Sequence, residues 1–289
     1  MLEIFQAQRP RLFGIAYRMT GSASEAEDLL QEAWLRFQTV PAAEVRSPEA
    51  LLTTIVTRLA LDHLKSAQAQ REVYPGLWLP EPLPTTNGVE EELLDTMIKL
   101  ESISLAFLHL LESLSPEERA VFLLREVFDY EYRELAEFIN KSETNCRQLF
   151  SRAKKHITDH RPRFPTNPAE HERVFHSFIE AAESGDLNQL MAVMADDVVC
   201  YADSGGKATA PTRPLHGPES VAKFVKGVQR TGYKPGDTIE MPLINGRPGI
   251  VVRNAQGEST TVLTLDIADG AIRALHFIRN PDKFQQLHR

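Results

Sequence analysis

Polar and basic side chains recur at helical spacing between Thr144 and Lys155, which places them on one face of a helix. The members of that face are Thr144, Arg147, Gln148, Ser151 and Lys155. Arginine can read the edge of a guanine and glutamine that of an adenine, while the neighbouring Arg152 and Lys154 suit phosphate groups. A solvated basic helix face would show the same pattern, so this stretch alone leaves DNA binding open.

Two short helices and a tight turn must hold this face in place. Apolar residues recur at helical spacing over 132–139, and Asn140-Lys141 then interrupts the pattern. Ser142 is suited to cap the second helix, whose buried side we expect to be Cys146, Phe150, Ala153 and Ile157. The pair predicts a helix-turn-helix.

Charge is distributed unevenly along the chain. The formal net charge of −8 argues against nucleic acid as a partner. Residues 141–163, however, carry seven lysines and arginines against two acids, whereas residues 117–137 carry seven acids against three arginines. A basic segment beside an acidic one indicates one face for a polyanion and another for a protein.

The first 71 residues predict a bundle of three helices. The first helix breaks at "TGS" (20–22), and Ser24 is suited to cap the second. The third opens at "SPEA", with Ser47 as its cap and a proline at its first position, and ends near Arg71. Further along the chain, "SPEE" (115–118) predicts a capping box.

The segment "YPGLWLPEPLPTTNG" (74–88) separates this bundle from helices that we expect to resume near Glu90. Its prolines exclude a helix, yet it carries Trp78, one of two tryptophans in the chain. Flexible tethers are rich in glycine and serine and present nothing apolar. The composition therefore predicts that a surface receives this linker.

A second boundary falls at "RPRFPTNP" (161–168), and the pattern then changes. Two helices follow, the second with an apolar stripe of Leu187, Leu190, Met191 and Met194. The later runs "GIVVR", "STTVLTLDI" and "AIRALHFIR" alternate and are rich in β-branched residues. We expect an α+β domain with an antiparallel sheet.

Composition excludes several classes of protein. A chain of 289 residues predicts two or three compact units, and 42% hydrophobic with 25% charged residues is typical of soluble proteins. No apolar run approaches the roughly 20 residues of a membrane span, and the N-terminus lacks the apolar core of a secretory signal. Cys146 and Cys200 lie far apart without histidines at zinc-like spacing, so we expect a reducing cytosol and neither disulfide nor metal.

Two stretches together resemble a known family. "ASEAEDLLQEAWLRF" followed by "LLTTIVTRLALDHLK" resembles the second domain of bacterial sigma factors of the extracytoplasmic-function (ECF) type. "SLSPEERAVFLLREVFDYEYRELAEFINKSETNCRQLFSRAKKHI" resembles their fourth domain, and the order and gap are as in the family. The resemblance implies two all-α domains that bind promoter DNA and core RNA polymerase.

The resemblance also assigns roles to individual positions. Asp28, Gln31 and Glu32 match the helix face that grips the coiled coil of the polymerase β′ subunit. The third helix, with Arg58 and Lys65 on the same face as Thr54 and Leu61, would engage the minus-ten element. The recognition helix, including Arg152, would read the minus-thirty-five element, and the acidic segment 117–137 would face the polymerase β flap or solvent.

The remaining 120 or so residues look like a SnoaL-like domain, a cone-shaped α+β fold. One sub-group of these sigma factors carries such an extension with a "WLPEP" linker, a "DGGGK" loop and an "NPDK" ending. This chain has "WLPEP" (78–82), "DSGGK" (203–207) and "NPDKF" (280–284), with Ser204 in place of one glycine.

These three motifs predict where the linker binds. We expect Trp78, Leu79 and Pro80 to dock on the C-terminal domain, which would fix the two DNA-binding domains in cis and replace a separate anti-sigma protein. The candidate receivers are Asp203, Lys207, Asn280, Pro281, Asp282 and Lys283. The alternative is that Trp78 packs against its own neighbouring helices.

The C-terminal domain is also compatible with other functions. A cone-shaped domain encloses a pocket, in which a small ligand could bind or Asp203, Lys207, His216, His276 or Asp282 could act as acid and base. A two-component regulator is disfavoured, because the N-terminal helices match no receiver pattern. We expect a cytoplasmic protein without catalytic residues or cofactor, divided into a helical domain (1–72), a linker (73–90), a helix-turn-helix domain (91–162) and a SnoaL-like domain (168–289).

Overall fold

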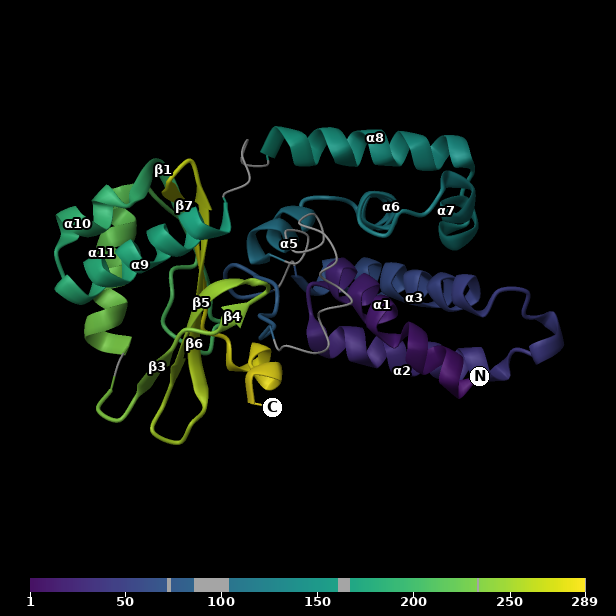
Figure 1. Cartoon of the computed structure of the whole chain (residues 1–289), viewed down its shortest axis with the longest axis horizontal. Helices are drawn as coiled ribbons and strands as arrows, with labels where there is room; N and C mark the ends of the chain where they lie inside the picture. Colours follow the sequence, from purple (N-terminus) through teal and green to yellow (C-terminus); the bar gives the residue numbers. More distant parts are fainter. Residues whose placement is uncertain (72–73, 86–103, 161–166, 233, 289) are drawn as a thin grey trace. The chain divides into compact units, whose positions relative to one another are not determined.

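The computed structural model describes residues 1–71, 74–85, 104–160, 167–232 and 234–288 (Figure 1). The chain forms two compact units. The N-terminal unit contains Met1–Val73 and Thr86–Arg161, and the C-terminal unit contains Tyr74–Thr85 and Pro162–Arg289. The helix expected from Glu90 and most of the boundary at 161–168 lie outside the described residues.

Three long helices build the first part of the N-terminal unit: α1 (Leu2–Thr20), α2 (Ala23–Thr39) and α3 (Pro48–Arg71), with the 3-10 turn η1 (Ala42–Glu44) between the last two. Gly21 ends α1 in the left-handed conformation, at φ 70°. Ser22 caps α2 by accepting a hydrogen bond from the Glu25 amide, so the prediction of Ser24 as the cap was wrong. Ser24 already lies inside the helix, because Ser22 follows the end of α1 at Gly21 directly and α2 begins at Ala23.

The helix-turn-helix follows in the same unit: α5 (Leu105–Leu111), α6 (Pro116–Glu126), α7 (Tyr132–Ile139) and α8 (Glu143–His160). The capping box at Ser115 is confirmed, with Glu118 as its reciprocal partner. Asn140 ends α7 at φ 53°, and Ser142 Oγ accepts from the Asn145 amide to start α8. The buried side of α8 differs from the prediction at one position, since Leu149 is buried and Phe150 is half-exposed.

Helices and strands are mixed in the C-terminal unit. Its helices are α9 (Pro168–Ser184), α10 (Leu187–Ala192) and α11 (Pro218–Gly232). Its strands are β1 (Met194–Asp203), β2 (Leu215–His216), β3 (Thr238–Glu240), β4 (Leu243–Ile244), β5 (Arg247–Arg253), β6 (Ser259–Ala268) and β7 (Ala271–Ile278). Two 3-10 turns, η2 (Pro281–Lys283) and η3 (Gln285–His288), follow the last strand.

These strands form one sheet in the order β2-β1-β7-β6-β5-β3, with β4 paired to β5. The sheet is mixed rather than antiparallel, because β1 runs parallel to β7. The three helices pack on one face of it (Figure 1), and the core between them includes Phe175, Phe178, Val221, Leu263 and Leu275. The expected strands over 249–279 are confirmed, whereas Met194 was wrongly placed in a helix and begins β1.

Candidate linker-binding site and nucleic-acid interface

Asp203, at the end of β1, is the centre of a buried polar cluster in the C-terminal unit. Its Oδ1 accepts hydrogen bonds from the Tyr74 hydroxyl at 2.6 Å and the Gly205 amide at 3.0 Å. Its Oδ2 accepts from the Leu79 amide at 2.8 Å and from Lys283 Nζ at 2.5 Å. A fully buried carboxylate is costly unless it is paired and hydrogen-bonded, and here each oxygen has two donors.

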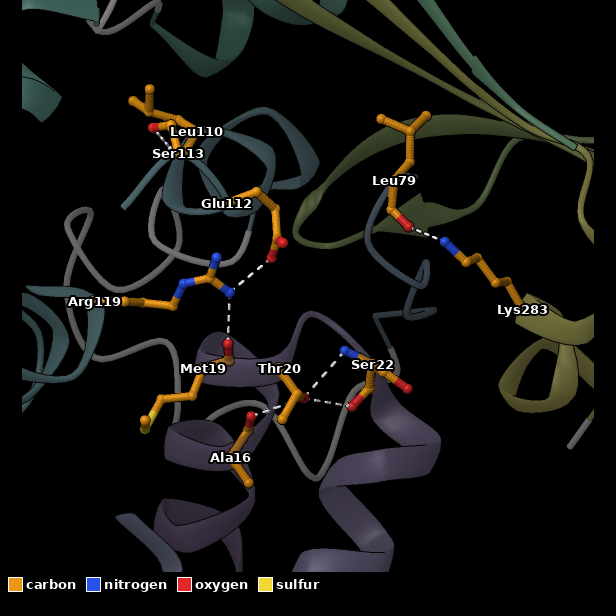
Figure 2. Close-up of polar contacts among 10 residues, drawn as sticks. All are labelled: Ala16, Met19, Thr20, Ser22, Leu79, Leu110, Glu112, Ser113, Arg119 and Lys283. Carbon is orange, nitrogen blue, oxygen red and sulfur yellow. Dashed lines mark hydrogen bonds and ion pairs between the residues drawn. The ribbon is translucent and has the colours of Figure 1, made fainter. Parts of the chain in front are cut away.

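Lys283 joins this carboxylate to the linker. Its ammonium also donates to the Leu79 carbonyl, as Figure 2 shows, and it lies 4.1 Å from the centre of the Trp78 ring. The Tyr74 ring lies on the same ammonium at 5.6 Å. A desolvated cation over aromatic faces is attracted by the ring quadrupoles, so Lys283 binds the linker through both charge and stacking.

The turn η2 positions Lys283. Asn280 caps this turn, since its Oδ1 accepts from the Asp282 amide at 3.1 Å. The same side chain donates through Nδ2 to the Tyr74 hydroxyl at 2.9 Å. One asparagine therefore sets both the direction of the lysine and the position of the tyrosine that contacts Asp203.

Two glycines let the 203–207 loop approach the linker. A Cβ on Gly205 would lie 2.5 Å from Asn280 Nδ2, and one on Gly206 would lie 3.0 Å from Pro75 Cγ. Both glycines are left-handed, at φ 56° and 72°. The left-handed positions thus lie after Ser204, which explains why serine is tolerated there in place of glycine.

The linker makes a second set of bonds beyond Pro80. Leu83 and Asn245 form two hydrogen bonds with each other. The Leu83 amide donates to Asn245 Oδ1 at 2.9 Å, and the Asn245 amide donates to the Leu83 carbonyl at 2.8 Å. The Thr85 amide donates to the Leu243 carbonyl at 2.8 Å, and Thr85 Oγ1 accepts from the Gly246 amide at 2.8 Å. The turn between β4 and β5 thereby extends the linker-binding site.

Sequence reasoning missed two members of this site, Tyr74 and Asn245. Burial, together with the hydrogen bond to Asp203, raises the pKa of Tyr74 well above its usual value, so the hydroxyl stays a neutral donor. The "NG" dipeptide at 245–246 predicts a hairpin turn, but nothing in it points to a distant linker. Only the fold brings these residues to residues 79–85.

The other predicted receivers lie at the rim of the cluster. Lys207 and Asp282 pair with each other at 2.5 Å, with side chains 52% and 61% exposed. Pro281 opens η2 and is exposed. The structure therefore brings Asp203, Asn280 and Lys283 to the linker and leaves this surface pair beside it.

The candidate acid and base groups do not converge on a catalytic arrangement. Asp203 is saturated by donors, His276 is buried and stacked on Tyr201 at 5.4 Å, and His216 is exposed. Within the described residues, no three His, Cys, Asp or Glu side chains gather as a metal site. Cys146 and Cys200 are both free and buried.

A separate apolar cavity lies between α9, α11 and the sheet. Its volume is about 250 Å³, and its walls include Phe178, Val225, Leu263 and Phe277. Glu183 and Gln229 supply polar groups to an otherwise apolar lining. Such a site can hold a small, largely apolar molecule that donates one or two hydrogen bonds.

The predicted DNA-reading side chains of α8 are all exposed: Thr144, Arg147, Gln148, Ser151, Arg152 and Lys155. Arg147 lies 4.2 Å from the centre of the Tyr132 ring and 3.5 Å from Glu143. Lys154 pairs with Glu126 at 3.3 Å. The stacking holds the Arg147 guanidinium in place ahead of any ligand, although exposed contacts of this kind are weak.

The two predicted minus-ten residues of α3 have different surroundings. Lys65 is exposed, whereas Arg58 donates to the carbonyls of Glu137 and Phe138 at 2.8 and 3.0 Å. Leu61, expected on the same face, is only 6% exposed and belongs to the core. The helix therefore presents a narrower polar face than its sequence predicted.

On α2, Asp28, Gln31 and Glu32 are exposed as expected. Leu35 continues this face one turn further and is 58% exposed, which sequence reasoning missed. The spacing of 28, 31, 32 and 35 was a signal that could have identified it. Polar residues around an exposed leucine are suited to a protein partner.

Known proteins match two segments of the N-terminal unit and, in full-length relatives, almost the whole chain. A family model described as Sigma-70 region 2 matches residues 4–70, and one described as Sigma-70, region 4 matches residues 104–157. The ECF RNA polymerase sigma factor SigJ of Mycobacterium tuberculosis is 37% identical and aligns with 97% of this chain and 92% of its own. The probable ECF RNA polymerase sigma factor SigI of the same species is 29% identical, over 98% of this chain and 94% of its own. The crystal structure of M. tuberculosis SigJ superposes with a TM-score of 0.76 at 34% identity and covers 99% of each chain.

Proposed function

The chain belongs to the ECF RNA polymerase sigma factors, and on that premise we propose that its C-terminal unit regulates promoter recognition in cis by holding the linker. The fold is two helical sigma regions followed by an α+β domain, and the protein is a promoter-recognising sigma factor. The observation that carries the proposal is the Asp203–Lys283 pair closed on Leu79 and Trp78. In an ordinary flexible tether, the Leu79 backbone and the Trp78 ring would be solvated rather than bound to a buried ion pair.

Holding the linker changes how far the two sigma regions can separate. Residues 74–85, when fully extended, span about 40 Å. Docking on the C-terminal unit removes that length from the tether between region 2 and region 4. The prolines of the segment also reduce the entropy lost on docking, since the unbound linker is already stiff.

The remaining partners follow from the residues described above. Asp28, Gln31 and Glu32, with Leu35, would bind the β′ coiled coil of core RNA polymerase. Arg58 and Lys65 would engage the minus-ten element, and the α8 face would read the minus-thirty-five element. The acidic segment 117–137 would lie toward the β subunit.

The proposal also implies that the protein needs neither an anti-sigma protein nor catalytic residues of its own. Control in cis would make a dedicated anti-sigma protein unnecessary. RNA synthesis would be catalysed by the core polymerase, so no catalytic residue or cofactor is expected in this chain. The protein would act in the cytoplasm, where the core polymerase and the promoter DNA are. Its proposed functional parts are the region 2 domain (1–72), the linker (73–90), the helix-turn-helix domain (91–162) and the C-terminal domain (168–289).

Two full-length variants test regulation by the linker. Trp78→Ala removes the stacking partner of Lys283, and Asp203→Asn removes its charge partner. Both should change core-polymerase binding in a pull-down and transcription from a cognate promoter, while the surface variant Lys207→Met behaves as the wild type. If all three variants match the wild type in both assays and remain folded, the proposal fails.

The cavity supports a second candidate function, the sensing of a small ligand. Its apolar walls with Glu183 and Gln229 suit a planar aromatic molecule with a hydrogen-bond donor. Titration with a polyketide-like aromatic compound should give saturable binding. The variant Leu263→Trp, which fills the cavity, should abolish it; equal binding by both proteins would reject this site.

A further inference from the structure

We propose that Tyr132 is a positioning residue for promoter recognition, whose ring holds the Arg147 guanidinium in the orientation that reads a guanine of the minus-thirty-five element. This inference rests on the proposed reading of that element by α8, and it adds the residue that prepares the arginine for it. Arg147 Cζ lies over the Tyr132 ring, 4.2 Å from its centre. Tyr132 is the first residue of α7 and Arg147 lies in the second turn of α8, so the turn of the helix-turn-helix brings them together.

The ring restrains this arginine without using its hydrogen-bond donors. A guanidinium that stacks on an aromatic ring makes the contact through its flat face, whereas its five N–H groups point outward in its plane. A guanine in the major groove presents two acceptors, O6 and N7, to a pair of such N–H groups. Because the ring takes up neither a donor nor the charge, a guanidinium fixed in this way still binds a base.

Glu143 holds the same arginine in a different way. Its Oε2 lies 3.5 Å from Arg147 Nη2, at i,i+4 spacing, and both side chains are exposed. A carboxylate occupies N–H donors and offsets the positive charge that attracts DNA. Without the ring, Glu143 would be the remaining partner of Arg147 among the residues that the structure describes, and DNA would first have to break that ion pair.

Tyr132 is itself fixed by the core of the helix-turn-helix. Its ring meets Phe150 edge-on, with the ring centres 6.1 Å apart, and Phe150 stacks on Phe122 at 6.1 Å. Phe122 is only 4% exposed and belongs to α6, which packs against α8 (Figure 1). Aromatic pairs of this kind add to the energy of burial, so the ring has a defined position before DNA binds.

A second arginine holds the same ring from α6. Arg125 Cζ lies over the Tyr132 ring at 5.2 Å. Its Nη1 donates to the Tyr130 carbonyl and to Glu131, each at 2.9 Å. These bonds connect the end of α6 to the residues just before α7, so the start of α7 is held through both its backbone and the ring.

The pair of Tyr132 and Arg147 lies beside groups that suit the DNA backbone. Both residues line a hollow of about 410 Å³, whose walls also include Phe150, Ser151, Lys154 and Lys155. The two lysines are exposed and suit phosphates, whereas Ser151 belongs to the predicted reading face. One surface can therefore make both kinds of contact, those that position a protein on DNA and those that read its sequence.

Holoenzyme made from the full-length chain and core polymerase tests this proposal. Selection from random duplexes identifies the preferred minus-thirty-five element, and each of its guanines is then replaced by 7-deazaguanine, which lacks the N7 acceptor. The readout is the ratio of the affinities for the unmodified and the modified duplex. In the wild type one guanine should give a ratio of about five, and Arg147→Met should lower that ratio to about one.

Variants of the ring supply the second arm. Tyr132→Ala should lower the ratio at that guanine from about five to about two, whereas Tyr132→Phe keeps the ring and should keep the wild-type ratio. A merely structural defect would weaken binding to both duplexes alike and leave the ratio unchanged. Lys154→Met, which removes a phosphate contact, should show this uniform loss. Circular dichroism establishes that each variant is folded.

The outcomes separate this inference from the function on which it rests. A folded Tyr132→Ala variant with the wild-type ratio, when Arg147→Met has lost it, would overturn the positioning role of the ring and leave the reading by α8 intact. A wild-type ratio in Arg147→Met, or a wild type that is insensitive at every guanine, would reject the reading by Arg147 and this inference with it.

Discussion

Two contacts hold segments of this chain through a cation, yet in opposite settings: the linker-binding site and an arginine interface. In the arginine interface, Arg11 and Arg58 of region 2 contact the helix-turn-helix at Phe128, Tyr130, Glu137 and Phe138. Lys283 and Asp203 are 10% and 0% exposed, and both carboxylate oxygens are saturated by donors. Arg58 is exposed and binds two backbone carbonyls, which carry partial charges only. Breaking the first contact leaves the buried Asp203 carboxylate without its cation, whereas breaking the second returns a cation to water. The buried site is thus suited to hold the linker permanently, and the exposed arginine interface is suited to release its partner.

The largest expected effect comes from breaking the buried pair. Lys283→Met should lower the free energy of unfolding of the C-terminal unit by about 3–5 kcal/mol, because Asp203 would stay buried without its partner. Lys207→Met breaks an ion pair of the same 2.5 Å length, but an exposed one, and should lower it by less than about 1 kcal/mol. Chemical denaturation of the two full-length variants measures both values. Equal losses would remove the distinction between the two settings.

The next effect concerns the aromatic partner. Trp78→Ala removes a half-buried ring and its stacking with Lys283, and should cost about 2 kcal/mol. Trp78→Phe keeps an aromatic face and should cost about half as much. Denaturation of both variants measures the two losses in free energy of unfolding. A loss below about 0.5 kcal/mol for Trp78→Ala, roughly the scatter for surface positions, would mean that the ring does not hold the linker.

Acid should weaken the C-terminal unit through His171. Burial, with a contribution from the charge of Arg247, lowers the pKa of His171 to about 4 from 6.5. The unfolded chain therefore binds the proton first, so the stability is fully present above about pH 6.5 and is lost as the pH falls toward 4. Between pH 7 and pH 5 we expect a loss of about 1–2 kcal/mol.

Removing the buried histidine isolates that effect. His171→Leu should flatten this part of the stability profile, measured by denaturation at each pH, while the exposed His216→Leu should leave it unchanged. An identical pH slope in His171→Leu and the wild type would assign the acid sensitivity to other groups.

The smallest effect is that of salt on the two contacts. Raising ionic strength from about 0.05 to 0.5 M shortens the Debye length to about 4 Å and should weaken the exposed arginine contacts by about 0.5–1 kcal/mol. The buried Lys283–Asp203 pair should be nearly insensitive to salt. Denaturation at low and high salt measures both, with and without Arg58→Ala for the first contact and with and without Lys283→Met for the second. Equal salt sensitivity would contradict the comparison.

Local signals predicted much of the fold. The caps at Ser47 and Ser115, the break at Asn140 and the strands after Gly249 could be read because each depends on a few neighbouring residues. Met194 was misplaced because an apolar residue after a helical stripe fits either a further turn or a strand. The parallel pairing of β1 with β7 joins segments about 75 residues apart, so no local pattern could predict it.

The candidate sites show the same limit. Motifs named both Lys207 and Lys283, but burial, which distinguishes them, arises from how η2 packs against the linker. Tyr74 and Asn245 were missed because their partners lie far away in sequence. Arg58 was predicted to meet DNA, and its contact with α7 depends on the docking of two helical regions that each fold from local signals.

Hydrogen exchange of the full-length protein, alone and with core polymerase, tests most directly whether the C-terminal unit holds the linker while the arginine interface exchanges. The amides of Leu79, Leu83 and Thr85 donate to that unit and should exchange slowly in both states. Residues 128–138 should exchange faster once polymerase opens the interface. Fast exchange of the linker amides in the free protein, or their release on polymerase binding, would contradict this account.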